Sequence, residues 1–117
     1  ILKESWKQSE FPNLNGTHSL ELIRIDRASL KELPQDLCSK TPKLRSLVLH
    51  RNKITKVPKL EACKDLRLLD LSNNEIKEIE DLRFERQNEL QDLLLQNNLL
   101  SEIRPNTFVG LRSLQVL

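Results

Sequence analysis

The sequence predicts an α/β solenoid, a horseshoe with short parallel strands on its concave side and mostly irregular segments on its convex side. Two observations predict this fold class. Leucine occupies 25 of 117 positions, whereas aromatic residues make up 3% and Tyr and Met are absent. Leucine, isoleucine and asparagine also recur at a nearly constant interval. A narrow core in which the same type of side chain occupies equivalent positions of successive repeats is typical of stacked coils.

The recurring pattern is LxxLxLxxNxL. It begins at Leu20, Leu44, Leu66, Leu90 and Leu114, at intervals of 24, 22, 24 and 24 residues. This is the pattern of the leucine-rich repeat. We therefore predict a single array over residues 1–117, with the tail of one repeat in 1–19, full repeats starting near 20, 44, 66 and 90, and a truncated repeat from 114.

Each repeat opens with a short strand. Because alternate side chains of a strand point to opposite faces, Leu47 and Leu49 are predicted to point inward and Val48 and His50 outward onto the concave face. The convex segments are predicted to complete the core, and Pro34 and Pro58 disfavour a regular helix there. The predicted convex core residues are Leu33, Val57, Ile79, Ile103, Leu37, Leu60, Phe84 and Phe108.

Asparagine ends the strands. The amides of Asn52, Asn74 and Asn98 are predicted to bond backbone groups that the turn leaves without partners, forming a ladder across the coils. Ala28 occupies the same position in the first full repeat. We expect a local irregularity there, with the turn carbonyls satisfied by backbone or water.

Composition excludes several functions. The chain has 19 Lys and Arg against 17 Asp and Glu and few aromatic residues, so we expect no nucleic acid partner. No apolar run approaches the roughly 18 residues of a membrane span, so we expect no membrane contact in these residues. The chain starts at Ile1 and stops within an apolar pattern, which we interpret as an excerpt or a processed chain.

Nothing in the sequence predicts catalysis, a metal site or a cofactor. His18 precedes a strand, and His50 stands beside Arg51, a cation that makes it a poor general base. Asp26 and Asp70 have no spacing that pairs them as acid and base. We expect these side chains to be solvated, and a charge reversal at Asp70 to leave stability nearly untouched.

Cys38 and Cys63 lie 25 residues apart on consecutive convex segments. They are either a disulfide or two separate buried thiols. They lack a CxxC partner, which argues against zinc. Asn15-Gly16-Thr17 is a glycosylation sequon, or simply a polar turn. Together, the cysteines and the sequon favour an extracellular setting.

Three segments resemble a known family: FPNLNGTHSLELIRI (11–25), LPQDLC (33–38) and KVPKLEAC (56–63). They are similar to the ectodomains of leucine-rich-repeat-containing G-protein-coupled receptors, in the branch that includes vertebrate R-spondin receptors and the insect bursicon receptor. The resemblance implies a Cys38–Cys63 disulfide, a secreted hormone or growth factor as protein ligand, and a location on the extracellular face of the plasma membrane. The seven-helix domain of such a receptor would lie outside these residues.

The candidate ligand contacts are the outward positions of the strands. They mix apolar anchors with charges, as suits a protein ligand. They are Leu22, Arg24, Asp26, Arg27, Val48, His50, Arg51, Leu68, Asp70, Asp92 and Leu94.

A second interpretation is an intracellular scaffold or phosphatase-regulating protein. The 22-residue unit and its Ile76-Lys77-Glu78-Ile79 segment also resemble the shorter repeats of that class. The oxidation state of the two cysteines separates the two interpretations.

Overall fold

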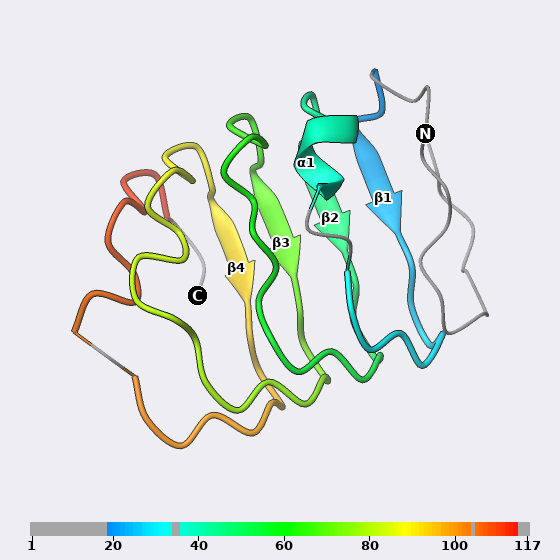
Figure 1. Ribbon diagram of the computed structural model, residues 1–117, viewed down its shortest axis with the longest axis vertical. Coiled ribbons are helices and arrows are strands. Elements are labelled where there is room, and N and C mark those ends of the chain that lie inside the picture. Colours follow the sequence, from blue (N-terminus) through cyan, green and yellow to red (C-terminus); the bar gives the residue numbers. More distant parts are fainter. Residues whose placement is uncertain (1–18, 34–35, 104, 115–117) are drawn as a thin grey trace.

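Four short strands lie side by side in one parallel sheet (Figure 1). They are β1 (Leu22–Arg24), β2 (Ser46–Val48), β3 (Leu68–Asp70) and β4 (Asp92–Leu94), in chain order. This computed structural model describes residues 19–33, 36–103 and 105–114. The predicted solenoid fold is confirmed.

Several sequence predictions lie outside the described residues. They concern Asn15, His18, Pro34 and nearly all of the predicted repeat tail in 1–19.

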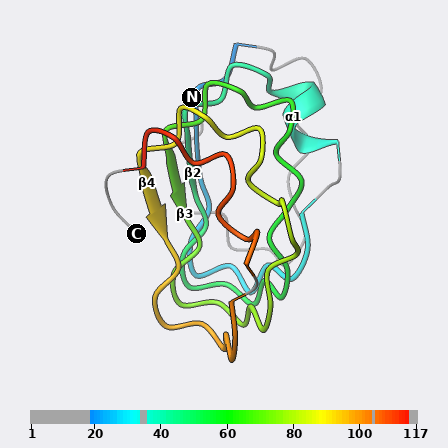
Figure 2. The same cartoon turned by 90° about the vertical axis from the view of Figure 1, so that its left-hand side faces the viewer.

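The strands occupy one side of each coil, and the returning segments occupy the other (Figure 2). The single helix in the described part of the chain is α1 (Leu37–Lys40), four residues long, on the convex side. The remaining convex segments are turns and irregular backbone. No helix among the described residues is long and apolar enough to cross a membrane.

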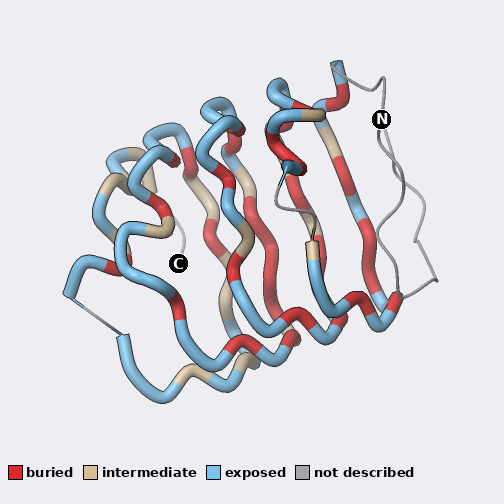
Figure 3. The backbone as a smooth tube through the Cα atoms, viewed as in Figure 1, coloured by how far each residue is buried: buried red, intermediate tan, exposed pale blue. Residues whose placement is uncertain are grey.

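The sheet register aligns the repeats. Ile23 pairs with Leu47, Leu47 with Leu69 and Leu69 with Leu93. All four side chains are fully buried. Buried and exposed positions alternate along each coil (Figure 3), because one face of every strand packs on the narrow interior while the other faces the concave side.

The convex core matches the prediction with one exception. Val57, Ile79, Leu37, Leu60 and Phe84 are buried, and Leu33 and Phe108 pack partly buried against them. Ile103 is 58% exposed, so its predicted burial is wrong. It belongs to the coil that starts at Leu90, the last one with a strand in the described residues, so no further strand-bearing coil there covers its outer side.

The asparagine amides form hydrogen bonds between coils. Asn74 donates to the carbonyls of Leu71 in its own coil and Leu49 in the preceding one, and its Oδ1 accepts from the Ile54 N–H. Asn98 repeats this arrangement one coil later. Each amide therefore stabilises an interface between two coils.

The coil with Ala28 is irregular, as expected. Ser29 has φ 57, a left-handed conformation that the corresponding residues of the other coils do not adopt. The Asn52 side chain of the next coil donates to the Ile25 carbonyl, and its Oδ1 accepts from the Leu30 N–H, as the later ladder asparagines do for the coils before them. The Ala28 N–H adds a further bond to the same Oδ1, a side-chain contact that the sequence pattern did not predict.

Candidate ligand-binding face

The outward positions of the sheet form three rows across the coils. Register fixes the first two rows, and the third lies two residues beyond the second in each coil. The rows are Leu22, Ser46, Leu68 and Asp92; Arg24, Val48, Asp70 and Leu94; and Asp26, His50, Ser72 and Gln96.

Four apolar side chains stand on this face, and none is fully exposed. Leu22, Val48, Leu68 and Leu94 are all half-buried. Each of the four strands contributes one of them. They are shallow apolar contacts on a rigid sheet, since the backbone beneath them is held in the parallel ladder.

The predicted contacts Arg27 and Arg51 lie at the edge of the face rather than on it. Both are exposed and have left-handed φ values of 56 and 60. They occupy the turn that leaves the strand, at the position filled by Asn73 and Asn97 in later coils. Asp92, by contrast, lies within the first row and is half-buried.

The structure brings Asp26, His50 and Asp70 together; we name these three the His50 cluster. The Nε2 of His50 lies 3.4 Å from Oδ2 of Asp26, and its Nδ1 lies 3.2 Å from Oδ2 of Asp70. Arg24 extends the cluster, with its Nε 3.6 Å from Oδ1 of Asp26. One imidazole thus bridges carboxylates from the coils on either side.

The expectation that these carboxylates are solvated is wrong. Asp26 is 8% exposed and Asp70 is 9% exposed. The Oδ1 of Asp70 accepts hydrogen bonds from the N–H and the hydroxyl of Ser72, at 3.0 and 2.7 Å. Burial is tolerated because each carboxylate has charged or hydrogen-bonding partners.

Ser72 beside the His50 cluster brings serine, histidine and aspartate close together, yet their hydrogen bonds differ from those of a nucleophile and its base. The Ser72 hydroxyl donates to Asp70 and not to His50, so the imidazole has no contact through which to activate it. This arrangement fixes the positions of the Asp26 and Asp70 carboxylates.

Removing Asp70 is expected to destabilise the fold. Asp70→Ala deletes the acceptor of two Ser72 donors and one partner of His50, so we expect a loss of about 1 to 3 kcal/mol. The matched control is Arg24→Ala, whose side chain is 50% exposed, with an expected change within about 0.5 kcal/mol. Urea denaturation measures both, and equal effects would contradict a structural role for the cluster.

On the opposite side, Cys38 and Cys63 form a disulfide with Cα atoms 5.1 Å apart. Both residues are buried. The bridge links α1 to the convex segment of the next coil. Of the two alternatives for these cysteines, the structure therefore has the pairing that the family resemblance implies.

Comparisons with known proteins agree with this architecture. Residues 64–117 match the family model described as "Leucine rich repeat", and residues 42–83 match "Leucine Rich repeats (2 copies)". The chain is 39% identical over 106 residues to leucine-rich repeat-containing G-protein coupled receptor 5 of Rattus norvegicus, which covers 91% of this chain and 12% of that protein. It is 38% identical over 114 residues to receptor 5 of Xenopus tropicalis, covering 97% of this chain and 13% of that protein. Receptor 6 of Homo sapiens is 40% identical over 82 residues, covering 70% of this chain and 8% of that protein.

Proposed function

The chain belongs to the leucine-rich repeat family, and we propose that it is a ligand-binding segment of an extracellular receptor domain coupled to a seven-helix domain elsewhere in the receptor. The observation that carries the proposal is the match of 91% of the chain to a named G-protein coupled receptor. The chain spans about an eighth of that relative. The ligand we propose is a secreted hormone or growth factor.

The concave face has the properties that a protein ligand requires. Its half-buried Leu22, Val48, Leu68 and Leu94 supply apolar contact, and anchors of this kind dominate binding energy when a partner excludes water around them. Arg24 and Asp92 supply charges beside them, which favour orientation and fast association.

The His50 cluster has a supporting role in this proposal. It links three successive coils through one imidazole and holds Arg24 beside Asp26. A face whose charged groups are fixed before binding loses less conformational entropy when a ligand docks. We therefore assign His50, Asp26 and Asp70 to positioning rather than to direct contact.

The disulfide supports an extracellular location, because buried disulfides persist in oxidising compartments. The alternative, an intracellular scaffold or phosphatase regulator, predicts reduced cysteines. Thiol titration of native purified protein distinguishes the two. Two free thiols would argue for the scaffold, whereas an intact bridge together with sugar on Asn15 would support the receptor.

Ligand binding by the concave face can be tested with an R-spondin, the ligand class that the family resemblance implies. We expect the double variant Val48→Glu/Leu94→Glu to bind on the order of ten-fold more weakly or worse, because two apolar anchors are replaced by charges. The matched control is Leu82→Glu, an apolar side chain 45% exposed in a convex turn, which should leave the affinity unchanged.

Binding is measured by biolayer interferometry, and thermal melts of each variant establish that it is folded. Unchanged affinity in the folded concave variant would refute contact at this face. If Leu82→Glu lowers the affinity equally, the loss of affinity is not specific to the concave face.

A further inference from the structure

The coil that starts at Leu44 is two residues shorter than its neighbours. The shortening lies in its convex half: 14 residues separate Asn52 from Leu66, whereas 16 separate Asn74 from Leu90. On one side stands α1 (Leu37–Lys40), and on the other stands the turn at residues 81–86. The short coil runs between these two elements in an extended path, with Pro58 half-buried.

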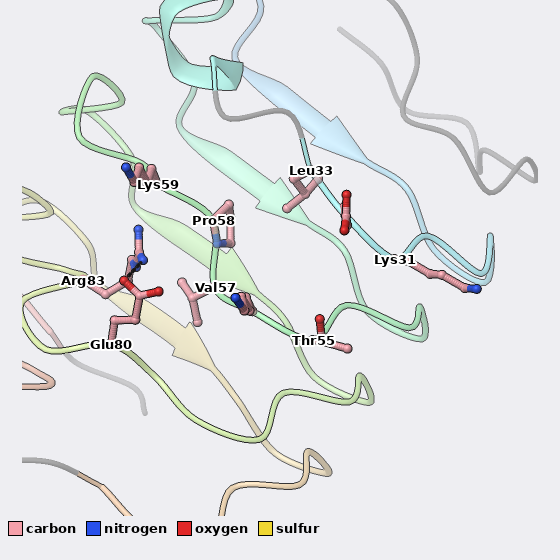
Figure 4. A pocket seen from close by; sticks show the side chains of 10 residues that line it. Lys31, Leu33, Thr55, Val57, Pro58, Lys59, Glu80 and Arg83 are labelled. Atoms are coloured by element: carbon pink, nitrogen blue, oxygen red, sulfur yellow. Dashed lines mark hydrogen bonds and ion pairs between the residues drawn. The ribbon is translucent and has the colours of Figure 1, made fainter.

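A groove of about 380 Å³ lies over the short coil (Figure 4). Three successive coils line it. Its apolar part includes Leu33, Val57 and Pro58, of which Val57 is buried and the other two are half-buried. We name this feature the convex groove. It lies on the side of the array opposite the concave face.

Four cationic side chains line the convex groove: Lys31, Lys56, Lys59 and Arg83. The carboxylates in the lining, as far as the described residues go, are those of Glu32 and Glu80. The three lysines are exposed and, within the described ranges, form no ion pair.

The fourth cation retains unused hydrogen-bonding capacity. Arg83 bonds Glu80 through one Nη, whereas its buried Nε has no acceptor among the described residues. The Glu80 side chain is 59% exposed, so an anion entering the groove can compete with it for the guanidinium. The groove thus combines ammonium groups in solvent with a guanidinium that is not fully satisfied.

We propose that the convex groove binds a sulfated polysaccharide chain. The cations come from three successive coils, and they are spread along the lining, with Lys31 at one end and Lys59 and Arg83 at the other (Figure 4). Such a spread suits a linear polymer with regularly spaced anions. The buried Val57 lies in the lining of the groove, so a narrow chain can reach further into it than a flat membrane surface can. Exposed lysines attract a polyanion because its binding releases counterions. This attraction does not require the ammonium groups to be held in fixed positions.

This site goes beyond the proposed function and is independent of it. Binding is measured with heparin, by fluorescence anisotropy of a labelled oligosaccharide and the purified protein at physiological ionic strength. We expect Lys31→Gln/Lys56→Gln/Lys59→Gln to bind at least about ten-fold more weakly and to lower the slope of log affinity against log salt by about two to three.

The matched control removes the same number of charges elsewhere, in Lys43→Gln/Lys64→Gln/Arg112→Gln. All three residues are exposed, without an ion pair in the described part of the chain, and we expect at most a two-fold change. Thermal melts check that both variants fold, and Arg24→Glu on the concave face should leave heparin affinity unaltered.

Three results would overturn the proposal. The first is an equal loss in both triple variants, which would indicate a diffuse effect of net charge. The second is no heparin binding by the unaltered protein, or equal binding of a desulfated chain. The third is tighter binding to phosphatidylserine vesicles than to heparin, lost in the groove variant, which would identify a membrane surface instead.

Discussion

Asn52→Ala is expected to lower the free energy of unfolding by about 3 to 5 kcal/mol, more than the same change at either other ladder asparagine. Asn52 bonds the coil of Ala28 as well as its own. Its Oδ1 accepts from the N–H groups of Ala28 and Leu30, and its Nδ2 donates to the Ile25 carbonyl. Alanine at this position leaves all three buried groups without that partner.

Asn74→Ala provides the graded comparison, with an expected loss of about 2 to 4 kcal/mol. Among the described residues, the Oδ1 of Asn74 accepts from the Ile54 N–H alone, and the Leu49 carbonyl that Asn74 bonds also accepts from Asn52. The control is Asn73→Gly, where glycine adopts the left-handed φ of 57 without strain. Denaturant melts measure the free energy of unfolding of all three variants. A loss for Asn73→Gly as large as the losses for Asn52→Ala and Asn74→Ala would contradict a stabilising role of the ladder.

Removal of the disulfide is expected to have an effect of similar size. Cys38→Ala/Cys63→Ala frees a loop closed over 25 residues, and the chain-entropy model gives a loss of about 3 to 4 kcal/mol. Equilibrium melts in guanidinium measure it. A truncated cysteine also leaves a small void, since both side chains are buried, which adds to the loss.

Reduced unaltered protein separates the two effects. It keeps both sulfur atoms in the core but lacks the bond, so the difference between oxidised and reduced protein measures the cross-link alone. We expect the reduced protein to melt between the oxidised protein and the double alanine variant. Identical midpoints for the oxidised and reduced forms would show that the bridge adds no stability.

Periodicity predicted the parts of the fold that repeat. Leu47, Leu69 and Leu93 are buried at register positions because each coil has the same narrow interior and the same alternation along its strand. The ladder amides are likewise visible at a fixed distance from each strand. The repeat pattern describes a coil that has a neighbouring coil on each side. Ile103 lies in the last coil that has a strand in the described residues, and its side chain is exposed.

The His50 cluster could not be predicted from spacing along the chain. Asp26 and Asp70 are 44 residues apart and become neighbours only through the sheet register, which sets His50 beside the first and diagonal to the second. Writing the repeats in aligned rows places all three on adjoining coils. It does not give their burial, which depends on side-chain rotamers and on the hydroxyl of Ser72.

The sharing of ladder amides between coils bears on how this array can be recombined. In the sequence, a repeat ends before the next leucine pattern begins. Part of the hydrogen bonding of each coil nevertheless comes from the asparagine of the following coil. A graft cut at sequence boundaries therefore separates a coil from the side chain that completes it. Chimeric arrays should transfer each coil with the first turn of the following one, and transplants made in that way are expected to melt more cooperatively.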